Sequence, residues 1–267
     1  MGLDVFGIFK NSFQILFNNK TVITLAVING LLGALLYLML PQQSAFGAYS
    51  QTPQFSLASL VGIIVFVLIS IFVEGSILSA VATKSSLGEA LNRAGGRYIS
   101  LLGTSILTGI ILVVPAILII VPSALFSLGV LSGGGSPLLV GVMVILVLVG
   151  VVAIALFSIR LCIATVECVV GNNRAADSVR SSWSDTKGNF WGMFLTLLLI
   201  SIATGIIGGV FEFIFSTVGV SVVGSFLSSF ISTISTVALV LIYQGLGIQG
   251  SSTASPSAEK KSKAKSK

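Results

Sequence analysis

The sequence predicts an all-α polytopic membrane protein, and three observations support that fold class. Hydrophobic residues fill 55% of the 267 positions, charged residues fill only 8%, and the mean hydropathy is +1.09. A soluble domain carries about 25% charged residues, because its surface faces water. Six apolar stretches are also long enough to cross a bilayer as helices. None of them alternates apolar and polar residues with a period of two, which disfavours a transmembrane barrel.

The six predicted spans divide the chain into a membrane domain and a short tail. A hydrocarbon core about 30 Å thick requires about 20 apolar residues in a helix, which satisfies its own backbone groups inside lipid. The spans are Val22–Leu40, Leu57–Val81, Ile99–Val121, Leu138–Ile159, Phe190–Phe211 and Val222–Ile248. We therefore expect residues 1–250 to form a six-span membrane domain. Residues 251–267 are rich in Ser, Ala and Lys and are expected to form a disordered cytoplasmic tail.

The distribution of basic residues predicts the orientation. All 14 Lys and Arg residues fall on one side of a six-span topology. The opposite loops, Pro41–Ser56, Ser123–Pro137 and Glu212–Ser221, contain none. Because Lys and Arg are enriched in cytoplasmic loops, we expect a multi-pass protein of the cell membrane with both termini in the cytoplasm.

Three short segments with helical periodicity precede spans 1, 3 and 5. Each of these segments is predicted to be an amphipathic interfacial helix. In the first, Val5, Phe9, Phe13, Leu16 and Phe17 form one face, and Asp4, Gly7, Asn11, Gln14 and Asn18 form the other. The second begins at a capping box, Ser86 with Glu89. The third follows Asn172 and Asn173, with Ala176, Val179 and Trp183 on one face. This order predicts a threefold pseudo-repeat; the alternative is an ordinary six-span protein with helical inner loops.

Catalytic chemistry has little support in the composition. The chain contains no His, which removes Ser–His–Asp and Cys–His nucleophile systems and HExxH metal sites. Its two cysteines, Cys162 and Cys168, are too few for a disulfide framework and do not form a CxxC motif. We therefore expect no catalytic residue, no metal and no cofactor, and no enzymatic activity.

Ionisable residues inside predicted spans are costly and are candidates for function. Glu74 lies within the second span, and Arg160 and Glu167 lie at the inner end of the fourth. We expect a structural Glu74–Arg160 ion pair, with proton or ion coupling by Glu74 as the alternative. Pro115 is expected to kink the third span.

Small and hydroxyl residues mark the last two spans. The sixth span carries Ser225, Ser228, Ser229, Ser232, Thr233, Ser235 and Thr236. These side chains could line a polar path, or they could allow close helix packing, and packing is the favoured interpretation. Gly205 and Gly209 in the fifth span have the GxxxG spacing that indicates the same packing.

The stretch from Arg160 to Trp191 carries a more specific pattern. It contains Arg160-Leu161-Cys162-Ile163-Ala164, then Glu167 and Ala176, then Ser182-Trp183 and Thr186-Lys187-Gly188-Asn189-Phe190-Trp191. This pattern resembles the membrane domain associated with glycerophosphoryl diester phosphodiesterases, which also has free-standing bacterial and archaeal relatives. The resemblance implies a six-span domain that accompanies an enzyme. In that family the phosphodiesterase chemistry resides in a separate soluble barrel. No catalytic residue carries over, and Arg160, Glu167, Trp183, Gly188, Phe190 and Trp191 are interpreted as structural motif residues.

Two functions from different classes follow. The first is a non-enzymatic integral membrane protein that interacts with lipid or holds a partner. The alternative is a small-solute or ion transporter or channel that uses Glu74 and the Ser-rich sixth span. The expected partners are membrane lipids, with another membrane or peripheral protein as a second class; nucleic acid is not expected, and the sequence does not define an oligomeric state.

Overall fold

The computed structural model describes residues 3–39, 57–127 and 137–247, and every regular element in these ranges is an α-helix. The first three helices are α1 (Val5–Asn18), α2 (Lys20–Met39) and α3 (Leu57–Thr83). The middle of the chain forms α4 (Leu87–Ser127), α5 (Pro137–Leu161), α6 (Ala164–Val169) and α7 (Ala175–Asp185). The last two helices are α8 (Phe190–Thr217) and α9 (Ser221–Gly245).

Six helices of the described chain are long and apolar enough to cross a membrane, namely α2, α3, α4, α5, α8 and α9. Each of them overlaps one of the six predicted spans, and α4 and α8 extend well beyond theirs. This agreement confirms the all-α class and makes the chain a multi-pass integral membrane protein. The predicted tail, residues 251–267, and the predicted loop Pro41–Ser56 lie outside the described residues.

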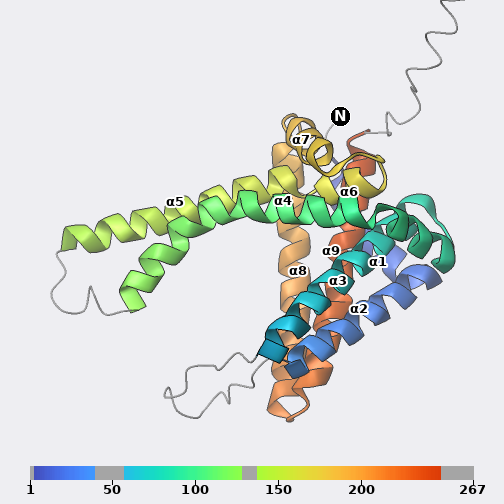
Figure 1. The fold of residues 1–267 in the computed structure, drawn as a ribbon, viewed down its shortest axis with the longest axis horizontal. Coiled ribbons are helices and arrows are strands. Elements are labelled where there is room, and N and C mark those ends of the chain that lie inside the picture. Colours follow the sequence, from blue (N-terminus) through green and yellow to red (C-terminus); the bar gives the residue numbers. More distant parts are fainter. Residues whose placement is uncertain (1–2, 40–56, 128–136, 248–267) are drawn as a thin grey trace, which may run out of the picture.

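The helices form one main group and one projecting hairpin (Figure 1). In the main group α8 pairs with α9, and α2 packs on α9 and on α3. Helices α4 and α5 pair into a hairpin that runs crosswise to α8 and α9 in Figure 1 and contacts the rest chiefly through α3, α6 and α7. Most apolar side chains of α5 remain exposed, as expected for a surface that lipid covers.

The main core lies where α1, α3, α6, α8 and α9 converge. Its fully buried side chains include Leu16, Leu78, Val166, Met193 and Ile234, one from each of these helices. Because the core gathers at one end of α8 and α9, the short helices are held there by apolar burial. Both ends of the described chain also meet at this place, since Leu3 lies against Gly192 and Gly245.

Helix α1 is a distinct short helix before the first span. The Asp4 carboxylate accepts a hydrogen bond from the Gly7 N–H at 2.9 Å and caps its start. Its buried side chains are Ile8, Ser12 and Leu16, whereas Phe9 and Phe13 are only half-buried. The predicted apolar face is therefore rotated, because α1 packs against α8 and α9 as well as α2.

The second predicted interfacial helix is not separate from its span. The capping box forms, with the Ser86 N–H donating to the Glu89 carboxylate at 3.2 Å, but α4 then continues to Ser127 without a break. It also continues through Pro115, and its ribbon bends along the way in Figure 1. The third predicted helix is α7, whose buried side chains are Ser178, Val179 and Ser182; Ala176 is exposed.

The topology can be tested by cysteine accessibility on intact cells. Single cysteines introduced at Ser44 and Gly134, which both lie outside the described residues, should react with an impermeant maleimide. A cysteine introduced at Arg180 should stay unlabelled until the membrane is permeabilised. Labelling at position 180 in intact cells would reverse the predicted orientation.

Candidate functional site

The motif residues around Arg160 meet where α5, α7 and α8 join. The Arg160 guanidinium donates to the Trp183 carbonyl at 3.2 Å and lies over the rings of Trp183 and Phe190, at 5.6 and 5.9 Å from their centroids. The Ser182 hydroxyl donates to the Arg160 carbonyl at 2.7 Å. A guanidinium stacked on two rings is a stabilising arrangement, so this part of the motif acts as a clamp between helices.

Glu167 lies on α6, a short helix that sequence patterns did not predict. Its side chain is only 2% exposed, and it accepts a hydrogen bond from the Asn173 amide at 2.9 Å. Its other carboxylate oxygen has no partner within the described residues. A Cβ on Gly171 would stand 2.7 Å from both the carbonyl and the carboxylate of Glu167, so glycine permits this tight connection into α7.

Gly188 and Trp191 are not part of the clamp. A Cβ on Gly188 would meet no atom within 4 Å, and Gly188 lies in the turn between α7 and α8. Trp191 is 71% exposed and makes edge contacts with Phe190 and Phe194. An exposed indole at the start of a span fits an interfacial anchor.

Glu74 and Arg160 do not form the predicted ion pair. Glu74 is half-buried on α3 and makes no hydrogen bond or ion pair within the described ranges, whereas Arg160 is engaged by Trp183 and Phe190. The physical reason is the helix order: α3 and α5 both pack on α4, which separates them. The expected pair of opposite charges therefore does not form, because α4 stands between the two helices that carry them.

The hydroxyl-rich face of α9 is used for helix packing. A Cβ on Gly33 of α2 would overlap the Ser229 side chain, and one on Gly208 of α8 would stand 3.1 Å from the Ser228 hydroxyl. Gly205 and Gly209 are exposed, and a Cβ added to either would meet nothing within 4 Å, so the GxxxG prediction named the wrong glycines. The close contact uses Gly208 because that position faces α9.

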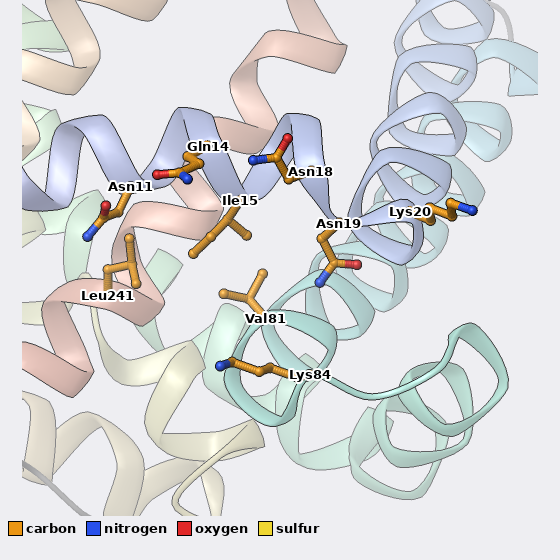
Figure 2. Close-up of a pocket in the computed structure, with 9 residues that line it drawn as sticks. All are labelled: Asn11, Gln14, Ile15, Asn18, Asn19, Lys20, Val81, Lys84 and Leu241. Atoms are coloured by element: carbon orange, nitrogen blue, oxygen red, sulfur yellow. The ribbon is translucent and has the colours of Figure 1, made fainter.

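A groove of about 520 Å³ opens between α1, the end of α3 and α9 (Figure 2). Its floor is apolar, since Ile15, Val81 and Leu241 face one another across it in Figure 2. Its rim is polar and carries amide and ammonium groups from Asn11, Gln14, Asn18, Asn19, Lys20 and Lys84. In Figure 2 the Lys84 side chain reaches below Val81, whereas the Lys20 ammonium points away from the other lining side chains.

This groove is the best candidate for a functional site, because it combines an apolar floor with hydrogen-bonding groups at one end of the bundle. The helical periodicity of the sequence predicts Asn11, Gln14 and Asn18 on the polar face of α1 but does not mark them as a site. The available signal was three amide side chains on one helical face. Lys84 had no local signal, because it reaches the groove through tertiary packing.

Asn29, which joins α2 to α9, was not among the residues predicted from the sequence. Its amide donates to the Ser229 carbonyl at 2.8 Å, with longer contacts to the Ser232 and Thr233 hydroxyls at 3.5 and 3.4 Å. An amide inside an otherwise apolar span is the signal that could have identified it. Replacement by Leu keeps the volume and removes the hydrogen bonds, so the unfolding free energy should fall by about 1 kcal/mol in a detergent melt. An unchanged melt would show that these bonds contribute nothing to the α2–α9 contact.

Comparisons with protein-family models, with curated proteins and with solved structures give no match to this chain.

Proposed function

We propose that this chain is a non-enzymatic integral membrane protein that binds membrane lipid at the end of the bundle where α1 packs. The groove below α1 carries this proposal: an apolar floor beside polar groups is complementary to an amphiphile. A lipid can place its chain or glycerol region against Ile15, Val81 and Leu241 and its headgroup against the amides and Lys84.

The exposed aromatic side chains of α1 support the same proposal. Phe6 is 77% exposed and Phe17 is 58% exposed, although both belong to a helix that packs on the core. In Figure 2 the chain turns sharply at Asn19, so that α2 leaves α1 crosswise. If α2 crosses the bilayer, α1 lies along its surface, where phenyl rings partition favourably between headgroups.

The resemblance of the Arg160–Trp191 stretch to a phosphodiesterase-associated membrane domain also supports a companion role. Under this proposal the clamp around Arg160 is structural, and the chain holds lipid or a partner protein for chemistry performed elsewhere. The positive-inside rule assigns the groove to the cytoplasmic side of the cell membrane.

Filling the groove tests the proposal. Ile15→Trp places a bulky ring on the apolar floor, whereas Phe17→Trp exchanges one exposed aromatic for another on the same helix. We expect native mass spectrometry of the detergent-purified full chain to show one fewer retained lipid for Ile15→Trp and an unchanged count for Phe17→Trp. Equal lipid counts in all three proteins would contradict the proposal.

Glu74, which has no partner among the described residues, favours the alternative, a transporter or channel for a small solute or ion. A half-buried carboxylate in a span is a candidate for coupling. If that alternative holds, proteoliposomes should show solute or proton flux that Glu74→Gln abolishes. Flux that is absent, or insensitive to this change, favours the lipid-binding proposal.

A further inference from the structure

Lys84 has an unusual backbone conformation at the edge of the groove. It directly follows the last residue of α3, and its φ is +50°. Glycine is the usual residue in this left-handed conformation at a helix end, because a Cβ there is unfavourable. Among the non-glycine residues described, the other positive φ belongs to Asn172, a residue type that tolerates this region better. The chain thus keeps a lysine where glycine would fit with less strain.

The Lys84 ammonium has no counter-charge within the part of the chain that the structure describes, and Lys84 is exposed at the groove. The Asn19 side chain lines the groove on the side opposite Lys84. Its side-chain oxygen already accepts from the N–H groups of Thr21 and Val22, at 3.0 and 3.4 Å. Its amide N–H groups are therefore the part left to interact in the groove.

The groups presented by Lys84 and Asn19 are thus hydrogen-bond donors, one of them cationic. Donors of this kind favour an anionic oxygen acceptor, and an ammonium binds phosphate as a point charge. The apolar floor next to them favours a ligand that also carries an apolar part. We infer that the groove binds an anionic phospholipid through its phosphate group, and that Lys84 is the main determinant of the preference for a headgroup of net negative charge. This inference rests on the proposed lipid-binding function and names its ligand class.

Lys84→Gly is a test variant that should not harm the fold. Glycine relieves the left-handed strain while removing the ammonium, so the unfolding temperature should stay the same or rise. Asn172→Gly is the matched control. It makes the same backbone change at the other positive-φ position and keeps the carbonyl that accepts from Arg97 at 3.4 Å.

The experiment compares phosphatidylglycerol with phosphatidylcholine on the full chain by native mass spectrometry. One cationic contact near the surface corresponds to a preference of about fivefold for the anionic lipid. We expect this preference in the wild type and in Asn172→Gly, and its loss in Lys84→Gly with both lipids still bound. An undiminished preference in a folded Lys84→Gly protein would overturn the inference while leaving lipid binding intact. Failure of the wild type to retain either lipid would instead refute the proposed function.

A competition arm distinguishes the lipid from free phosphate. Phosphatidylglycerol bound to the wild type should persist in millimolar inorganic phosphate, because the apolar floor contributes only to lipid binding. Displacement by inorganic phosphate would identify the free anion as the ligand and overturn the assignment to a phospholipid.

Discussion

Gly30→Leu is expected to separate α2 from α9 and to give one of the largest losses of stability in this protein. A Cβ at Gly30 would stand 2.8 Å from the Phe226 ring and 3.0 Å from the Phe226 carbonyl oxygen. Because the Cβ itself makes the contact with the backbone, no rotamer of the new leucine relieves it. Overpacking of this kind costs roughly 3 kcal/mol, which corresponds to a fall of about 6 to 12 °C in the unfolding temperature.

The control for this change is Gly205→Leu. Gly205 also lies in a span, but it is exposed and a Cβ there meets no atom within 4 Å. Scanning fluorimetry in one detergent should therefore show a large shift for Gly30→Leu and little change for Gly205→Leu. Similar shifts for both variants would mean that α2 and α9 do not approach as closely as the structure shows.

Arg160→Met should also destabilise the protein strongly. It removes a charge-assisted hydrogen bond to the Trp183 carbonyl and the stacking of the guanidinium on two rings. Methionine keeps much of the apolar contact, so the expected loss is about 2 kcal/mol. Arg160→Lys should recover only part of it, because an ammonium lacks the planar fork and stacks less well.

Arg93→Met is the matched control for the Arg160 prediction. Arg93 is exposed on α4 and makes no interaction within the described residues. Its replacement should leave the melting temperature nearly unchanged. If Arg93→Met and Arg160→Met lower stability equally, the effect comes from net charge and the clamp is not a stabilising unit.

The spans were predictable because bilayer thickness imposes a length and an apolar composition that each segment shows locally. The continuity of α4, in which the predicted interfacial helix and the third span form one helix, was not predictable from the sequence. The change from polar to apolar residues near Ile99 predicted an interfacial helix that is separate from the third span. Backbone hydrogen bonds do not depend on that change, and glycines such as Gly95 and Gly96 cost only about 1 kcal/mol each, so one helix runs through.

The candidate site was less predictable, because it depends on which helix faces meet. Nothing local places Lys84 beside α1, since the contact requires the fold of α2 and α3 back onto α9. Likewise, the sequence placed Glu74 within the second span and Arg160 at the inner end of the fourth, but it did not show that α4 would separate them. The Arg160 motif was more predictable, because the sequence pattern singles out Trp183 and Phe190 and both rings do contact Arg160.

Occupancy of the groove below α1 by a phospholipid is tested most directly by photo-crosslinking. The full chain in nanodiscs is irradiated with a headgroup-proximal diazirine analogue of phosphatidylglycerol. We predict adducts on the α1 and α3 peptides that contain Ile15 and Val81, and their loss in Ile15→Trp. Adducts spread evenly over the exposed faces of α5 and α8, with the groove peptides unmodified, would contradict phospholipid binding in the groove.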